Sequence, residues 1–305
     1  MSVQSSLLAA CAAGVLLSSC ETPTYGAGGA IGAALPAASG VFAGAADLDR
    51  LAIATVPAAR FEAAAQSSPR TGPPTLSSHE AKTASLFTGR SFLAAGKVLG
   101  REAKETPRAL VTEQIPAGWG RKDERLVHAE SGLECPLEFD FSAGPGDAGA
   151  LSLSDISSYD ETNRDVSCNY SNGGAAIVTV YASFYPDISV EDHAAAAVAA
   201  MRRTFTLGDA MPVVSVEIED KDAGATTADL EEPIAGAFDI GEINGEAYKT
   251  ALWIAKTGGW HVKTRATYAH ADFTAEIVAA VIFAANYLNV DMKNKADPTP
   301  TGPEV

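Results

Sequence analysis

Aromatic and basic residues are both scarce in this chain, and each shortage has a consequence. Phe, Trp and Tyr make up only 7% of the 305 residues, so most of the core must consist of aliphatic and small side chains. Lys and Arg number 22 against 38 Asp and Glu, which gives a formal net charge of −16. A surface of that sign repels nucleic-acid phosphates and anionic lipid headgroups. We therefore expect no nucleic-acid partner.

Motifs of common catalytic and metal sites are also missing. The closest two of the five histidines are nine positions apart, so no HExxH zinc site can form. There is no GxSxG elbow, SxxK pair or Walker A loop. Asp220, Asp222 and Glu231 have the spacing of an EF-hand loop. Gly224 and Ala225, however, stand where that loop requires an oxygen ligand and a glycine. We expect a solvated acidic loop there, and neither a metal nor a cofactor.

The N-terminus has the pattern of an export signal. Residues 6–17 are small and apolar, and the run ends in Leu17-Ser18-Ser19-Cys20. About a dozen apolar residues are too few to span a bilayer but fit the core of a signal peptide. Residues 1–19 and Cys20 resemble the signal peptide and lipobox of a bacterial lipoprotein precursor. The resemblance implies that Cys20 is lipidated and becomes the first residue of the mature protein.

Lipidation of this kind would place the protein in the cell envelope. Several acyl chains on one cysteine anchor a protein stably, so the resemblance implies a membrane partner and a domain that faces the periplasm. Residues 1–20 contain no Lys or Arg, whereas such precursors begin with a positive end. Plain secretion and an uncleaved cytoplasmic chain therefore stay open as alternatives, as does the choice between the inner and outer membranes.

Cysteine usage agrees with an envelope location. If Cys11 leaves with the signal peptide and Cys20 carries lipid, Cys135 and Cys168 remain. An even pair in an oxidising compartment predicts a disulfide. With 32 residues between the two cysteines, closing this loop would stabilise the fold by roughly 3–4 kcal/mol. Two buried free thiols are the alternative.

Composition divides the mature chain into three parts. Residues 20–106 are rich in Gly, Ala and Pro and predict a tether with short, partly ordered segments, one of them opened by a capping box at Ser77. Residues 107–290 predict a globular domain. The polar residues 291–305 predict a disordered tail.

The pattern within the domain predicts an α+β fold. Ser189 and Asp272 are each expected to cap a helix. Strands are expected at 151–159, 166–170, 175–185, 213–218, 234–242, 247–256 and 260–268. This order predicts an antiparallel β-sheet with two main helices packed on it. Together with Pro116-Ala117-Gly118-Trp119, it resembles the PsbP/Mog1-like fold over about residues 110–290. That fold hosts several functions, so the resemblance implies no site residues.

The last hairpin holds the best candidate site. A three-residue loop at 257–259 would pair Ile254 with Val262, whereas a two-residue loop would set Leu252 against Arg265. We expect the three-residue loop, which keeps apolar residues together. One face of the hairpin then carries a basic patch around a tryptophan, formed by Lys249, Trp253, His261, Lys263 and Arg265. Such a patch would bind an anionic ligand or an acidic envelope protein. The alternative is a solvated face on which Lys263 stacks on Trp253.

These observations predict a non-enzymatic binding or structural module of the envelope, tethered by lipid. The alternative is an envelope hydrolase whose catalytic residues are dispersed along the sequence. A cleft that holds a nucleophile within hydrogen-bond reach of a base would favour the hydrolase.

Overall fold

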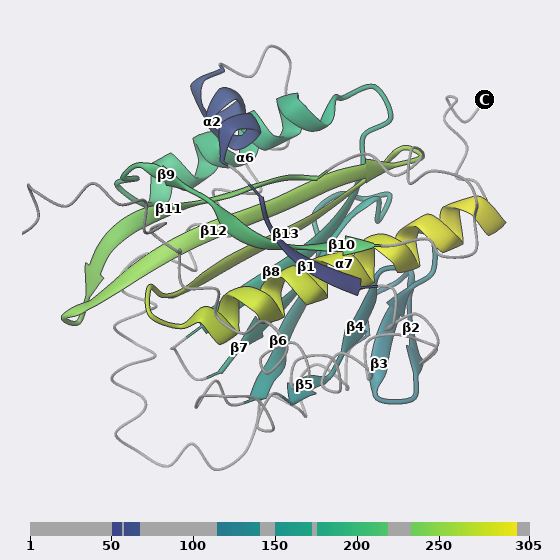
Figure 1. Cartoon of the computed structure of the whole chain (residues 1–305). Helices are drawn as coiled ribbons and strands as arrows, with labels where there is room; N and C mark the ends of the chain where they lie inside the picture. Colours follow the sequence, from purple (N-terminus) through teal and green to yellow (C-terminus); the bar gives the residue numbers. More distant parts are fainter. Residues whose placement is uncertain are drawn as a thin grey trace, which may run out of the picture.

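The computed structural model describes residues 51–56, 58–67, 115–140, 150–172, 176–218 and 233–297. The predicted signal peptide, Cys20, the capping box at Ser77 and the acidic loop lie outside these residues. The described chain is α+β, with helices on both faces of a large antiparallel sheet (Figure 1). The predicted fold class is therefore confirmed.

Eight antiparallel strands form the main sheet. Their spatial order is β5 (Glu138–Asp140), β6 (Ala150–Ser158), β7 (Asp165–Ser171), β8 (Ala176–Phe184), β13 (Trp260–Ala269), β12 (Glu246–Thr257), β11 (Ile234–Ile243) and β9 (Ala210–Met211). Strands β8 and β13 pair at the centre and join two meanders. Two smaller sheets complete the structure, namely β1 (Leu51–Val56) with β10 (Val213–Ile218), and β2 (Trp119–Lys122) with β3 (Arg125–His128) and β4 (Glu134–Pro136).

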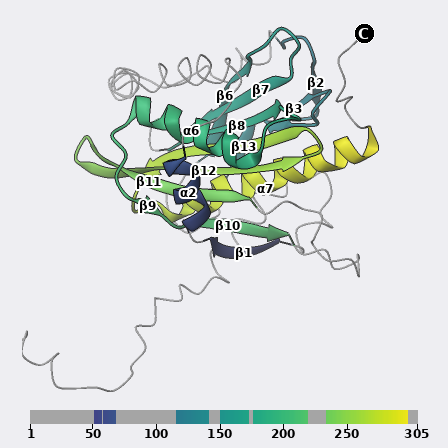
Figure 2. The same cartoon turned by 90° about the horizontal axis from the view of Figure 1, so that it is seen from above.

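Helix α7 (Phe273–Ala296) covers one face of the main sheet. As predicted, Asp272 caps it by accepting a hydrogen bond from the Ala275 N–H at 2.9 Å. The helix lies against β13 and β12 and is flanked by the β1–β10 ribbon (Figure 2). By length and composition α7 also qualifies as a membrane span, but 83% of its apolar window is buried, as in a core helix. Because α7 continues to Ala296, the predicted disordered tail at 291–305 begins too early.

Helices α6 (Val190–Thr204) and α2 (Ala59–Gln66) cover the opposite face. The Ser189 hydroxyl caps α6, as predicted, by accepting from the Asp192 N–H at 3.1 Å. Helix α6 packs on β11 and β12, and α2 packs on β11, in a second, smaller core that includes Phe61 and Leu252. A Cβ at Gly236 would lie 2.1 Å from the Phe61 ring, so only glycine lets α2 approach β11 this closely.

Residues 51–66 belong to this fold, although the sequence places them in the tether. Strand β1 pairs with β10 over six residues, from Leu51 with Ile218 to Val56 with Val213, and α2 packs on α6. The folded domain therefore includes a strand and a helix upstream of the predicted boundary at 107.

The register predicted for the last hairpin is wrong. Thr257 pairs with Trp260 around a two-residue Gly258-Gly259 turn, so Ile254 faces Lys263 and Leu252 faces Arg265. The positive φ of +57° at Gly258, the first turn residue, is typical of a tight hairpin turn. Side chains at the turn would also collide with Asn294 and Phe184. The prediction was wrong because it assumed that Lys263 and Arg265 could not share a face with Leu252 and Ile254. In this fold all four side chains are buried on the same face of the sheet.

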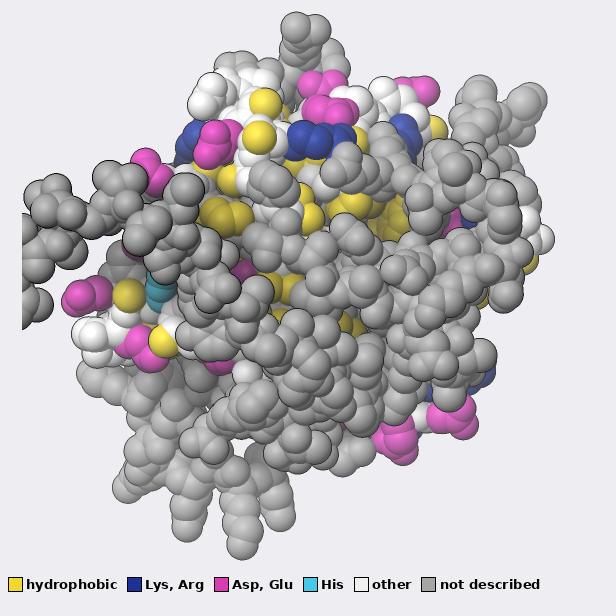
Figure 3. Space-filling model, in the orientation of Figure 1, with side chains coloured by type: hydrophobic (Ala, Val, Ile, Leu, Met, Phe, Trp, Pro, Cys, Tyr) yellow, Lys and Arg dark blue, Asp and Glu magenta, His cyan; other side chains and the backbone are white. Residues whose placement is uncertain are grey.

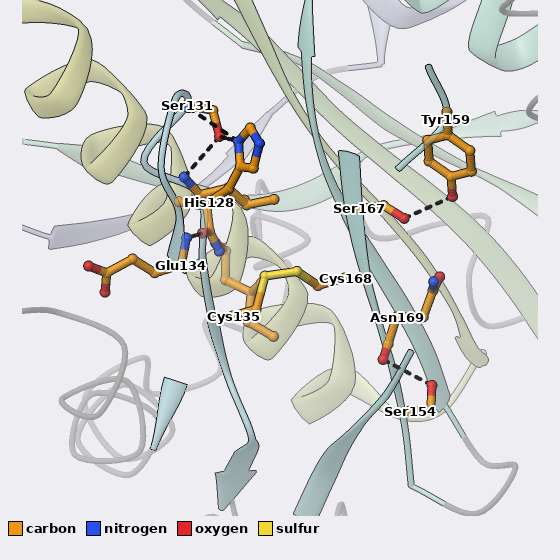
Figure 4. Close-up of a disulfide and its surroundings, with 12 residues drawn as sticks. His128, Ser131, Glu134, Cys135, Ser154, Tyr159, Ser167, Cys168 and Asn169 are labelled. Atoms are coloured by element: carbon orange, nitrogen blue, oxygen red, sulfur yellow. Dashed lines mark hydrogen bonds between the residues drawn. A yellow bond between two sulfur atoms is a disulfide. The ribbon is translucent and has the colours of Figure 1, made fainter. Parts of the chain in front are cut away.

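A disulfide joins the three-stranded sheet to the main sheet. Cys135 of β4 bonds to Cys168 of β7, with their Cα atoms 6.3 Å apart (Figure 4). Both residues are fully buried in the core beneath α7. The predicted pairing is confirmed.

Candidate functional site on the buried polar face of the sheet

The predicted basic patch is not a single surface. In the observed register Lys249 and Trp253 face α7, whereas His261, Lys263 and Arg265 face the side of α6. Trp253, His261, Lys263 and Arg265 are all buried. The one-residue difference in register places three of the five patch residues on the opposite face of the sheet from the other two.

Lys249 and Trp253 hold β10 against α7. The Trp253 indole N–H donates to the Val214 carbonyl oxygen at 2.8 Å, and the Val214 N–H donates to Glu276 Oε1 at 2.7 Å. Lys249 forms an ion pair with the other oxygen of Glu276, at a site where both side chains are mostly buried. The backbone N–H and carbonyl groups of Val214 are thus both fixed by side chains of β12 and α7, which is a structural role.

The other three residues lie in a buried polar layer on the opposite side of the sheet. Strand pairing sets His261 beside Ser183 and Asp165, Lys263 beside Tyr181 and Ser167, and Arg265 beside Thr179 and Asn169. We call these nine residues the polar face. All except the partly buried Asn169 are buried. A polar layer of this extent within a sheet core is the unusual feature of the fold.

Hydrogen bonds connect the strands of the polar face. Ser183 Oγ donates to Asp165 Oδ1 at 2.7 Å, and the Tyr185 hydroxyl donates to Asp165 Oδ2 at 2.8 Å. Thr179 donates to Asn169 Oδ1 at 2.9 Å, and Ser167 shares a hydrogen bond with Tyr159 at 2.8 Å (Figure 4). Each oxygen of the buried Asp165 carboxylate therefore has a donor.

The cations of the polar face lie over aromatic rings. Lys263 Nζ is 4.2 Å from the ring centroid of Tyr181, and the guanidinium carbon of Arg265 is 5.7 Å from that of Phe205. The predicted stacking of Lys263 on Trp253 is wrong, because Trp253 points to the other face and pairs with Thr264. Attraction to a ring face offsets part of the cost of burying a cation.

Two histidines meet above the polar face. The ring centroids of His193, from α6, and His261, from β13, are 4.8 Å apart, and the Tyr185 ring touches both. His261 Nε2 lies 3.2 Å and 3.1 Å from the carbonyl oxygens of Tyr185 and Ile188. These two acceptors assign the proton to Nε2. Within the described residues, His261 Nδ1 and both ring nitrogens of His193 have no hydrogen-bond partner.

Burial keeps both histidines neutral. It lowers the pKa of His261 to about 4, with the nearby Lys256 lowering the pKa as well and the Tyr185 and Ile188 carbonyls raising it. Burial, Lys263 and His261 together lower the pKa of His193 well below its ordinary value. This pair was not predicted from the sequence, because the two histidines lie far apart in the chain on different elements. The only signal was a histidine among the alanines of a helix face.

Two buried pairs resemble a nucleophile beside a base. Ser131 Oγ lies 2.8 Å from His128 Nδ1 (Figure 4). The same oxygen accepts the Leu133 N–H at 3.1 Å, so the pair closes the turn between β3 and β4. Ser183 beside Asp165 is the second pair. All four side chains are buried, and neither hydroxyl is presented to a substrate.

The exposed side of the α2–α6 layer carries mixed charge. Figure 3 shows basic and acidic side chains next to one another over these helices. Arg60 of α2 and Glu191 of α6 form an exposed ion pair at 3.1 Å. Among the residues that the structure describes, no group of three or more His, Cys, Asp and Glu side chains is arranged to hold a metal.

Comparison of the chain with protein-family models, curated proteins and solved structures finds no match.

Proposed function

We propose that the chain is a lipid-anchored protein of the cell envelope whose α+β domain is a binding or assembly module. The Cys135–Cys168 disulfide is the observation that carries the proposal. Disulfides persist in oxidising compartments such as the periplasm and are rare in the cytosol. The apolar residues 6–17 followed by Cys20 supply a route for export and a lipid attachment site.

The arrangement of polar groups favours a module over an enzyme. The hydroxyls of Ser131 and Ser183 lie within hydrogen-bond distance of His128 and Asp165, and both are buried and hydrogen-bonded within the fold. A catalytic nucleophile must reach a substrate within a pocket. The hydrolase alternative rests on the Ser131–His128 contact alone. Loss of a hydrolytic activity in Ser131→Ala, with an unchanged melting temperature, would support it.

Intact mass of the protein from its native host tests the anchor. We expect a species that begins at Cys20, carries acyl chains, and gains the mass of two hydrogens on reduction. The Cys20→Ser variant is the matched control, and it should lose both labelled palmitate and sedimentation with membranes. A full-length, unlipidated chain with free thiols would contradict the proposal.

Cross-linking in intact cells tests the module. The lipidated protein should yield discrete adducts with envelope proteins, and these should persist in Ser131→Ala. An anchored domain that yields no adduct, together with turnover of an ester or amide substrate, would instead support the hydrolase.

A further inference from the structure

We propose that His193 and His261 form an acid-sensitive latch, which holds the α2–α6 layer on the sheet at neutral pH and releases it on acidification. The latch is independent of the lipid anchor. It follows from how two imidazoles are placed at the interface between a helix and a sheet.

The latch is a pair of neutral rings that contact one another at an interplanar angle of 48°. Both rings are fully buried, and their centroids are 4.8 Å apart. Three of the four ring nitrogens have no hydrogen-bond partner in the described chain. The fourth, His261 Nε2, donates a hydrogen bond to the carbonyl oxygens of Tyr185 and Ile188, which lie in the loop leading into α6. If either ring gained a proton, the new N–H would therefore have no hydrogen-bond acceptor among the described residues.

The charges around the pair oppose protonation. Lys263 of β13 and Lys256 of β12 act on the pair from the sheet. Lys256 Nζ also donates to the carbonyls of Pro186 and Ile188, at 2.7 and 2.8 Å, which fixes its charge beside the loop. A buried cation next to another cation is strongly unfavourable.

The nearby carboxylates are already engaged. Asp165 of β7 accepts from Ser183 and Tyr185. In the first turn of α6, Glu191 pairs with Arg60, and Asp192 contacts the Ser189 cap. Helix α2 faces α6 with Phe61, Ala64 and Ala65, which carry no charge. Protonation of the two histidines is thus favoured only when their rings reach water.

The α2–α6 layer is the part of the domain that such a release would move. Half of the eight buried residues of α6 are alanines, namely Ala194, Ala195, Ala197 and Ala200, and alanine contributes less apolar burial than larger side chains. Helix α7, by contrast, buries valines, isoleucines and aromatic side chains in the larger core. Arg202 Nη1 donates to the Ala65 carbonyl at 2.7 Å, so α2 would leave together with α6.

Hydrogen exchange of the full chain as a function of pH tests the latch. After correction for intrinsic exchange, amides of α6 and α2 should lose protection below about pH 6.5, the ordinary pKa of histidine, while α7 stays protected. Each histidine that binds a proton on opening raises the opening constant about tenfold per pH unit. Between about pH 6 and about pH 4.5 the logarithm of that constant should therefore change with pH with a slope of about two.

Variants separate the latch from general acid sensitivity. His193→Phe keeps an aromatic ring against His261 and should reduce the slope to about one. His261→Gln keeps an N–H donor for the two carbonyls and should have the same effect, which covers the case in which His193→Phe does not fold. The matched control is the exposed His270→Gln, which should leave the slope at about two. An unchanged slope in both latch variants, or loss of α7 protection at the same pH as α6, would overturn the proposal.

Discussion

The indole N–H of Trp253 donates to the carbonyl oxygen of Val214 at 2.8 Å and thereby ties β10 to the main sheet. Trp253→Phe keeps the ring but leaves this buried carbonyl without its donor. We expect the free energy of unfolding to fall by about 1–3 kcal/mol in urea titrations. Trp119→Phe is the control, because the Trp119 indole N–H has no partner in the described chain, and it should cost less. Equal losses would show that ring packing, not this hydrogen bond, accounts for the effect.

The Lys249–Glu276 ion pair should show strong coupling. Both side chains are mostly buried, so removal of either one leaves an uncompensated charge. We expect Lys249→Met to destabilise the domain by about 2–4 kcal/mol. The double variant Lys249→Met/Glu276→Gln should lose less than the sum of the two single variants in a double-mutant cycle. Simple additivity would mean that the pair contributes nothing as a pair.

Removal of the disulfide should weaken the attachment of the three-stranded sheet. Cys135→Ala/Cys168→Ala should lower the free energy of unfolding by about 2–5 kcal/mol. Chemical denaturation under oxidising and reducing conditions measures the effect. The double variant should be indifferent to reductant, whereas the wild type should be destabilised by it. A wild type that is equally stable in both conditions would contradict this expectation.

Stability should fall as the solution becomes acidic. The pKa of His128 is lowered by burial to about 4, despite the opposing influence of Asp160. Between pH 6.5 and 4 the unfolded chain therefore binds a proton that the folded chain does not, so unfolding becomes easier as pH falls. This histidine should account for about 2 kcal/mol of the stability lost between pH 7 and pH 5. His128→Asn, which retains an acceptor for Ser131, should lack that portion in urea titrations at the two pH values.

Close approach of α2 to the sheet makes Gly236 sensitive to substitution. Gly236→Ala places a methyl group inside the Phe61 ring position, and we expect a loss of about 1–3 kcal/mol together with weaker protection of α2 amides. Gly120→Ala in β2 is the matched control, since a Cβ there meets nothing within 4 Å. Similar losses in the two variants would point to backbone effects of alanine instead of to α2 packing.

Local signals in the sequence predicted local structure well. The caps at Ser189 and Asp272, the strands from β6 onward except the two-residue β9, and the Cys135–Cys168 bridge follow from propensity, capping chemistry and cysteine counting. The failures concern long-range contacts. Strand β1 is short and pairs with a strand far along the chain, so its own residues do not mark it as part of the domain.

The prediction of an exposed basic patch was wrong for a related reason. Lys263 and Arg265 were expected at the surface, because charged residues are rarely buried without compensation. Their compensation comes in part from the rings of Tyr181 and Phe205, on other elements. The His193–His261 contact likewise exists only after α6 docks on β13. The pattern of residues within a single helix or strand cannot predict a contact between two elements.

The path of the chain between β1 and α2 has a mechanical consequence. Strand β1 lies with β10 on the α7 side of the main sheet, and α2, which follows it in the chain, lies on the α6 side. Strand β1 and helix α2 therefore hold the sheet from its two faces. Tension applied at Leu51 would load the β1–β10 ribbon before it reached α2 and the layer above the sheet.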